Sequence, residues 1–394
     1  MKQRKLGIAI IGLGGAVGTT MVAGIELLKK GLIGRAGLPL AELDANLTGD
    51  LTDYENIVFG GWDLFGEHLA KAAEEHDVLT HKQFVTVEGG LRKIKPWRAI
   101  GNKQFLANIE GENQFAEISS HRETIGKIRK DLQKFKKTCD QVVVINLAST
   151  EKLADEGNEI FNSIAGFEKA LDDNSKEISP AMIYAYAAIA ERAPYGNFTP
   201  SVSADIPALI EFAEKMRVPV AGKDGKTGQT FIKTVLAPAL KTRALKVEGW
   251  YSTNILGNRD GLALSNADSL ASKVKTKGSV LDDILGYKVE DHIVDIRYYR
   301  PRGDNKEAWD NIDITGFLGQ PMQLKINFLC KDSILAAPLA IEIARCLDLA
   351  KRRGKKGIQE QLSVFFKLPM TKNEKPEHSF HRQEQMLIDW LNST

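Results

Sequence analysis

Long hydrophobic runs and a strong excess of one charge are both missing from this sequence. No apolar run reaches the roughly 18 residues that a membrane-spanning helix needs, so no membrane span is predicted. The 53 lysine and arginine residues nearly balance the 51 aspartate and glutamate residues, which leaves a formal net charge of +2. Nucleic-acid-binding proteins normally carry a basic excess. We therefore expect neither a membrane nor a nucleic acid as a partner.

Cysteine is scarce as well. The three cysteines, Cys139, Cys330 and Cys346, are odd in number and widely spaced. This pattern is typical of a reducing compartment and predicts neither a disulfide framework nor a zinc site, so we expect a cytoplasmic protein. Among seven histidines only His378 and His381 are close together, in a polar tail. A solvated pair is the simpler interpretation there, and we predict no metal site from these residues.

The first part of the chain alternates between strand and helix patterns. The run "KLGIAIIGLGG" indicates a buried strand, and "AVGTTMVAGIELLKKG" the helix that follows it. The run "NIVFGGWD" predicts a second strand, and the β-branched "DQVVVINLAST" predicts a central one. This alternation favours a Rossmann-like, doubly wound α/β sheet up to about residue 225.

A different pattern follows. Three strand-like runs with alternating apolar positions, "LKVEGWYSTNILG", "YKVEDHIVDIRYYRP" and "QPMQLKINFLC", predict an open β-sheet. The long apolar helix "SILAAPLAIEIARCLDLAKRRG" should then pack back on the first sheet. We expect a nucleotide-binding domain over residues 1–229, completed by 336–394, and an α+β domain over 230–335.

A glycine-rich turn lies at the end of the first strand. Gly12, Gly14 and Gly15 end that strand, and Gly18 enters the helix, with Ala16 and Val17 between them. Without side chains such a turn lets a pyrophosphate approach the helix N-terminus. A merely tight strand-to-helix turn is the alternative. The preceding apolar strand and the following helix favour the dinucleotide site.

An acidic residue after the second strand should bind the adenosine ribose. Asp63 has this context, although it lies 45 residues beyond Gly18 instead of the usual 20 or so. It could equally be the N-cap of the next helix, and the two roles are compatible. An acidic rather than a basic residue favours NAD over NADP.

Three lysines are concentrated in "SLASKVKTKGSVLDD". On a helix Lys273 and Lys277 share a face and repel each other, whereas on a strand both share a face with Lys275. Either arrangement is unfavourable unless an anion joins it. The segment therefore predicts a site for an anionic ligand.

Many stretches together resemble one family, the myo-inositol-3-phosphate synthases, also called inositol-1-phosphate synthases. The matching pieces follow the family's order over residues 8 to 369 and include "GLGGAVGTT", "VFGGWD", "KIKPWRAI", "VVVINLASTE", "GKDGKTGQT", "LGNRDG", "SKVKTKGSVLDD", "GDNK", "LCKDSILAAPL" and "FFKLP". The chain is most similar to the short prokaryotic members, because the long N-terminal extension of the eukaryotic members is absent.

The resemblance implies an isomerase that converts glucose 6-phosphate to 1D-myo-inositol 3-phosphate. NAD stays tightly bound and is regenerated in each cycle, while carbon 5 of the sugar is oxidised, an enolate closes the ring by an aldol step, and the ketone is reduced again. A homotetramer is implied, with residues 230–335 providing catalysis and oligomerisation. Some short members use a metal, so a divalent or monovalent cation stays open, although no cluster in the sequence identifies its ligands.

Four site lysines are implied by the same resemblance: Lys273, Lys277, Lys306 and Lys367. Ammonium groups suit a site where an enolate and carbonyl oxygens develop negative charge. Lysines crowded by other lysines also have a lowered pKa, which suits proton transfer. Lys275 is expected to be an ordinary surface lysine.

The remaining implied site residues fall into three groups. Asp224 and Asp260 would be catalytic, with turn formation as their simpler role. The implied cofactor contacts, besides the glycine turn and Asp63, are Ala148, Ser149, Thr150, Asp224, Thr227, Asp332 and Ser333. The implied substrate contacts, besides the lysines, are Asn197, Thr199, Thr230, Asn258, Asp260 and Asp304. Asp332 could instead cap the helix that starts at Ser333.

The chain departs from the family pattern in three places. Lys223 stands where the family often has an acid, Arg259 where it has an asparagine, and "APYGNFTPS" where it has "GSPQNT". Two alternatives are an NAD-dependent dehydrogenase of a phosphorylated sugar or polyol, and a catalytically silent NAD-binding relative. Four site lysines favour the synthase over both.

Overall fold

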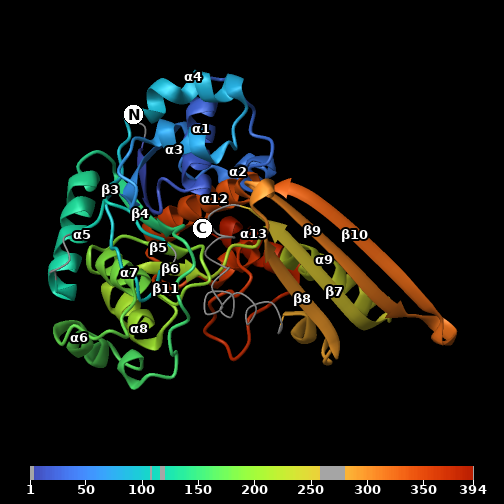
Figure 1. The fold of residues 1–394 in the computed structure, drawn as a ribbon. Coiled ribbons are helices and arrows are strands. Elements are labelled where there is room, and N and C mark those ends of the chain that lie inside the picture. The colour runs from blue at the N-terminus through green and yellow to red at the C-terminus, as the bar shows by residue number, and fades with distance from the viewer. Residues whose placement is uncertain (1–3, 107–108, 116–119, 258–279, 394) are drawn as a thin grey trace.

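Two separate sheets organise the chain. The computed structural model describes residues 4–106, 109–115, 120–257 and 280–393. Within these ranges there is a seven-stranded sheet and a four-stranded sheet. Figure 1 shows the smaller sheet projecting from the body that contains the larger one. The predicted α/β fold with an additional open sheet is confirmed.

The larger sheet is parallel throughout. Its strands, in spatial order, are β11 (Gly357–Ile358), β6 (Pro219–Gly222), β5 (Tyr195–Asn197), β4 (Gln141–Asn146), β1 (Leu6–Ile11), β2 (Ile57–Asp63) and β3 (Trp97–Arg98). Every residue of β1 is buried. Such a strand has a continuous apolar sequence because helices cover both faces of the sheet.

Helices form a layer on each face of this sheet. The first layer contains α1 (Ala16–Lys29), α3 (Leu69–His76), α4 (His81–Leu91), α12 (Asp332–Arg352) and α13 (Phe380–Asn392), with the short α2 (Ala45–Thr48) at its edge. The second contains α5 (His121–Lys136), α6 (Ile164–Asp172), α7 (Pro180–Ala190) and α8 (Pro207–Met216). The apolar stretch before Tyr195 is the helix α7, which is buried along nearly its whole length.

The strand order reverses at β1, and this places the site. Strand β1 pairs with β2 on one side and with β4 on the other. In doubly wound sheets the two adjacent connections leave opposite faces at such a point, and a crevice opens at the carboxyl ends of the strands. The predicted glycine turn follows β1 directly, so the sequence and the topology point to the same place.

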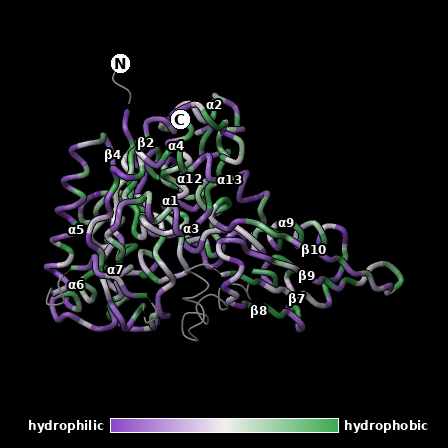
Figure 2. Tube along the Cα trace, turned by 45° about the horizontal axis from the view of Figure 1, so that its top comes forward, coloured by the Kyte–Doolittle hydropathy of each residue, from purple (hydrophilic) through white to green (hydrophobic). Residues whose placement is uncertain are grey.

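The smaller sheet has one covered face. Its order is β10 (Pro321–Lys331), β9 (Asn305–Thr315), β7 (Lys246–Leu256) and β8 (Asp291–Tyr298). The pairs β10–β9 and β9–β7 are antiparallel, whereas β7–β8 is parallel. Helix α9 (Gln229–Thr242) and the helical residues 280–285 pack on one face around Trp250 and Ile312. Figure 2 shows hydrophobic and hydrophilic segments interspersed along these projecting strands.

Helix α12 joins the two sheets. It follows β10 without a loop and packs against the first sheet through Ala340, Ile343 and Leu347, as predicted. A buried ion pair between Arg345 and Glu342, 2.6 Å apart, lies within it. In the part of the chain that the structure describes, no helix is long and apolar enough to cross a membrane.

Candidate active site

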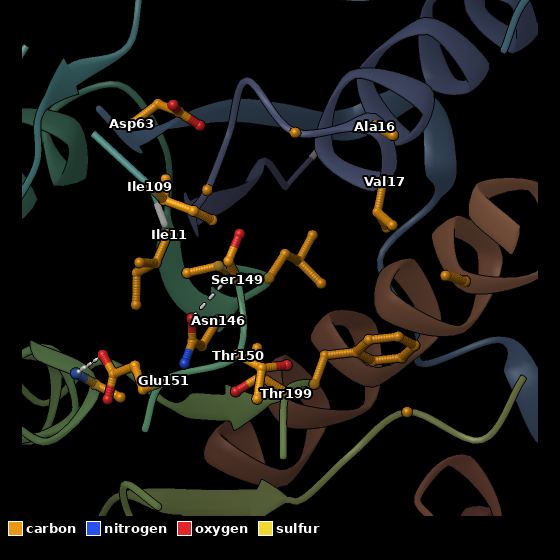
Figure 3. Close-up of a pocket in the computed structure, with 18 of the residues that line it drawn as sticks. Ile11, Ala16, Val17, Asp63, Ile109, Asn146, Ser149, Thr150, Glu151 and Thr199 are labelled. Carbon is orange, nitrogen blue, oxygen red and sulfur yellow. Dashed lines mark hydrogen bonds between the residues drawn. The ribbon is translucent and has the colours of Figure 1, made fainter. Parts of the chain in front are cut away.

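A pocket opens at the carboxyl edge of the larger sheet. Segments that follow β1, β2, β4, β5 and β6 all reach it, and the start of α12 closes the far side. Figure 3 shows side chains converging there from several strands. The lining residues that carry polar or charged groups are Asp63, His76, Asn146, Ser149, Thr150, Glu151, Tyr184, Thr199, Asp224, Thr227, Lys306, Asp332, Ser333 and Lys367.

The glycine turn fits a dinucleotide pyrophosphate. Gly12 has a φ of +85°, and a Cβ there would lie 3.0 Å from the backbone of Ala148. A Cβ on Gly18 would lie 2.5 Å from the Leu13 carbonyl oxygen. At Gly15, by contrast, a Cβ would meet only the Gly12 oxygen, at 3.2 Å, and this residue lines the pocket. In the described chain no side chain caps α1, so its amide groups can bind an anion.

Asp63 is built into the turn rather than into the next helix. Its carboxylate accepts hydrogen bonds from the amides of Gly14 at 2.8 Å and Phe65 at 3.0 Å. Helix α3 begins at Leu69, and its N-cap is His68. The N-cap role considered for Asp63 is therefore wrong. Asp63 lines the pocket beside the turn, and its role toward a ribose stays a prediction.

His76 is a site residue that the sequence did not indicate. Its Nε2 atom lies 2.9 Å from the Gly14 carbonyl oxygen, and the ring lines the pocket. Asp63 and His76 thus bind the amide and the carbonyl group of the same residue, Gly14. A histidine at the end of a polar helix carries no recognisable signal, because only the packing of α3 against α1 brings it to the turn.

The segment after β4 forms the floor of the pocket. Ala148, Ser149 and Thr150 line it, and their contact with a cofactor stays a prediction. Asn146 fixes their path, because its Oδ1 atom accepts from the Ala148 amide at 3.1 Å. Next to it, Asn197 accepts from the Thr199 hydroxyl at 2.9 Å and donates to the Ser201 carbonyl at 2.7 Å. Thr199 lines the pocket, and Asn197 lies behind it as its support.

Glu151 is a second residue that the sequence analysis missed. It lines the pocket, and its Oε1 atom accepts from the Ala181 amide at 2.9 Å in the first turn of α7 (Figure 3). Burial raises the pKa of this carboxyl to about 7, against the opposing effect of the Ser179 and Ala181 hydrogen bonds. Its position could have been predicted, since the segment that follows a central strand of a doubly wound sheet lies at the ligand-binding edge.

Two of the predicted site lysines enter from the opposite wall, each with a carboxylate. Lys367 lies 2.7 Å from Asp224, and Lys306 lies 3.2 Å from Asp332. All four side chains line the pocket. The Asp332 oxygen that faces Lys306 also accepts from Thr227, at 3.2 Å. The ammonium groups are therefore held by fixed carboxylates rather than crowded only by other lysines.

The neighbouring predicted residues support this wall. Asp304 accepts from the Ser333 hydroxyl at 2.8 Å, and Ser333 lines the pocket. Helix α12 begins at Asp332 with Lys331 as its N-cap, so the capping role considered for Asp332 is wrong. Asp224 has a φ of +59°, consistent with its predicted turn. Thr230 is buried in the first turn of α9.

Four predicted site residues lie outside the described residues: Asn258, Asp260, Lys273 and Lys277. Whether Lys273 and Lys277 share a helical face therefore stays a prediction. Among the described residues no group of three His, Cys, Asp or Glu side chains could hold a metal ion. We therefore assign no residue to the divalent or monovalent cation.

Fold and pocket together define a class, the NAD-binding α/β enzymes of the doubly wound type, here with a wall of lysine–carboxylate pairs. A family model described as myo-inositol-1-phosphate synthase, of the NAD-binding kind, matches residues 45–392. The chain belongs to the myo-inositol-1-phosphate synthase family, as its sequence motifs predicted.

Individual relatives agree with this assignment. The chain is 44% identical to inositol-3-phosphate synthase 1 of Bacteroides thetaiotaomicron, over 98% of this chain and 95% of that protein. It is 31% identical to inositol-3-phosphate synthase of Dictyostelium discoideum, over 92% of this chain and 78% of the relative. The structure of inositol-3-phosphate synthase from Caenorhabditis elegans matches all of this chain and 86% of its own, with a TM-score of 0.93 at 27% identity.

Proposed function

We propose that this chain is an inositol-3-phosphate synthase that cyclises glucose 6-phosphate to 1D-myo-inositol 3-phosphate without net redox change. The observation that carries the proposal is one pocket with two unlike walls. A glycine turn suited to NAD forms one wall, and the Lys306–Asp332 and Lys367–Asp224 pairs form the other. When bound, NAD supplies a hydride acceptor that the same cycle restores.

The lysines serve the carbon–carbon chemistry. Ring closure passes through an enolate and converts an aldehyde oxygen to an alkoxide, so negative charge develops on sugar oxygens. Ammonium groups fixed in a buried site stabilise such charge because they need no reorganisation as it forms. The partner carboxylates of Asp224 and Asp332 fix the direction of the Lys367 and Lys306 ammonium groups. A simple dehydrogenase needs one acid–base group and has no use for this wall.

The sugar phosphate fits beside Lys306. Helix α9 begins at Gln229, its N-terminus has no side-chain cap in the described chain, and Thr227 of the preceding loop lines the pocket. A Cβ on Gly228 would lie 3.3 Å from the Lys306 ammonium, so that charge lies against the start of the helix. A helix N-terminus next to a cation is a favourable site for phosphate. Thr230 in the first turn would add a hydroxyl.

The experiment follows both cofactor and product. Purified protein is incubated with glucose 6-phosphate and NAD, absorbance of NADH is recorded, and the phosphate ester that survives alkaline treatment is measured. A synthase leaves net NADH unchanged and accumulates the base-resistant ester. Accumulating NADH would instead indicate a dehydrogenase, and neither signal would indicate a silent relative. The same assay after dialysis against a chelator tests the need for a cation.

A homotetramer is also part of the proposal. The uncovered face of the smaller sheet carries Trp309, whose ring centre lies 5.4 Å from that of Tyr251, together with Ile293 and Leu329, which are 49% and 61% exposed. Exposed apolar side chains on a sheet face are stabilised when another copy of the chain covers them. Trp309→Glu should lower the sedimentation coefficient, because the assembly dissociates into smaller species. Val85→Glu on the remote helix α4 should leave it unchanged. A wild-type monomer at micromolar concentration would refute the assembly.

The cytoplasmic location stays a prediction. All three cysteines are free thiols in the structure, as a reducing compartment allows.

A further inference from the structure

One buried lysine next to the active site points away from it. Lys226 lies in the loop between β6 and α9, where its neighbours Asp224, Gly225 and Thr227 line the pocket. The Lys226 side chain is 4% exposed, and its ammonium donates to the Gln383 side-chain oxygen of helix α13. Gln383 is fully buried and donates in turn to the Glu377 carbonyl at 2.6 Å.

The first turn of α13 contacts both ends of this loop. The Lys226 ammonium lies 5.6 Å from the centre of the Phe380 ring, a cation–π distance. The same ring meets Phe231 of α9 edge-on at 5.3 Å. Phe380 and Gln383 therefore contact residues on either side of the stretch 227–230, which contains Thr227 and the N-terminus of α9.

The other sides of the loop are already fixed by the backbone. The Gly225 amide donates to the Phe198 carbonyl at 2.8 Å, and the Lys226 amide donates to the Phe365 carbonyl at 2.9 Å. The Lys367 amide donates to the Asp224 carbonyl at 2.7 Å. Lys367 and Asp224 are therefore joined by a main-chain hydrogen bond in addition to their side-chain ion pair. Helix α13 adds a further restraint through the side chains of Phe380 and Gln383.

A buried lysine lowers the free energy of unfolding unless its charge is compensated or contributes to function. Taking an ammonium out of water disfavours the charged form, and a neutral amide partner recovers only part of that loss. Burial accordingly lowers the pKa of Lys226 to about 7. A leucine or methionine could fill the same volume without this cost, so packing alone does not account for the residue.

We propose that Lys226 and Gln383 are positioning residues for catalysis, through which the C-terminal helix holds the loop that presents Asp224 and Thr227. This inference rests on the proposed synthase function for its kinetic consequence, but the restraint itself can be measured without activity. Neither residue touches the reacting groups. Their effect passes through the placement of the Lys367–Asp224 and Thr227–Asp332 contacts.

The test compares two glutamines of the same helix. Gln383→Leu removes the acceptor, whereas Gln385→Leu makes the same change at an exposed residue whose side chain donates to Asp389 at 2.7 Å. We expect Gln383→Leu and Lys226→Met to speed hydrogen–deuterium exchange of the amides of residues 224–228 at least tenfold, with α1 unchanged. Turnover per bound NAD should fall at least tenfold, and NAD occupancy should stay at the wild-type level.

A conservative variant and a pH profile separate positioning from general destabilisation. Gln383→Glu keeps the acceptor and gives Lys226 a charged partner, but it loses the donor to the Glu377 carbonyl, so it should retain clearly more turnover and amide protection than Gln383→Leu. The charged groups nearby are Asp224 on the same loop, His378 and Glu377 before α13, and Asp283 facing His378. A decline in wild-type turnover above pH 7 should be absent in Lys226→Met and moved to higher pH in Gln383→Glu.

Two results would overturn the proposal. One is exchange and turnover in Gln383→Leu that match Gln385→Leu, and the other is a Gln383→Glu variant as impaired as Gln383→Leu. A wild-type protein that forms no inositol phosphate would refute the proposed function instead. The exchange measurement would still decide whether α13 restrains the loop.

Discussion

The two walls of the pocket are built by different means. The cofactor wall is built mainly of backbone: a glycine turn and an uncapped helix start, with the carboxylate of Asp63 bonded to the Gly14 amide. The lysine wall consists of side-chain ion pairs, Lys367 with Asp224 and Lys306 with Asp332. Backbone geometry is set by neighbouring residues and tolerates little change in volume. Ion pairs depend on charge, and their partners come from distant parts of the chain.

This difference predicts that the cofactor wall fails by steric exclusion. Gly15→Val should abolish NAD retention while the protein stays folded, because Gly15 lines the pocket and an added Cβ meets only the Gly12 oxygen, at 3.2 Å. Bound NAD in the purified protein, measured by absorbance after denaturation, provides the readout. Gly24→Val, in open space on the same helix, is the matched control and should keep its NAD. Normal NAD content in Gly15→Val would show that the turn does not hold the pyrophosphate.

The lysine wall should fail by loss of charge, with the cofactor retained. Lys367→Met should lower turnover by at least 100-fold, since it removes oxyanion stabilisation and leaves the Asp224 carboxylate buried without its cation. NAD occupancy should be unchanged, which separates this wall from the glycine turn. Lys372→Met, at an exposed lysine five residues away, should behave as wild type. A Lys367→Met variant that loses NAD as well would remove the distinction between the walls.

Glu151 belongs to the cofactor wall but titrates, so it sharpens the comparison. Its folded-state pKa of about 7 lies above the ordinary 4.5, so the native state binds the proton more tightly than the unfolded state between these values. Stability due to this group is present below pH 4.5 and lost as pH rises through 7. From pH 5.5 to 8 the free energy of unfolding should fall by about 2 kcal/mol relative to Glu151→Gln. Urea denaturation of both proteins at the two pH values measures the difference, and parallel curves would contradict it.

Thr227 should show the smallest effect, because it only helps to orient Asp332. Thr227→Val removes a 3.2 Å hydrogen bond to the carboxylate oxygen that also faces Lys306, at nearly constant volume. We expect turnover to fall about tenfold, equivalent to roughly 1.4 kcal/mol, with NAD retained. Thr227→Ser keeps the hydroxyl and should recover most of the activity. Equal rates for the Val and Ser variants would show that the hydroxyl has no part in the lysine wall.

The cofactor wall was largely predictable from the sequence. The errors concern contacts between residues far apart in the chain, which their spacing along the sequence does not reveal. The glycine turn and the segment 148–150 were found because a buried strand and its following turn are contiguous in sequence. Asp63 lies beside the glycine turn, but its bond to the Gly14 amide was not predicted, since Gly14 is 49 residues away. His76 escaped notice for the same reason. Glu151 was present in a recognised motif and could have been inferred from its place after β4.

The sequence by itself determined the alternation of strands and helices, the glycine turn and the types of residue available for catalysis. Those features follow from local periodicity and from backbone freedom, which neighbouring residues specify. Only the tertiary structure decided which charges meet. Lys367 and Asp224 are 143 residues apart, and Lys226 and Gln383 are 157 residues apart. Such pairs form because the packed sheet brings their segments together and excludes water, and neither distance nor burial is encoded in the spacing along the chain.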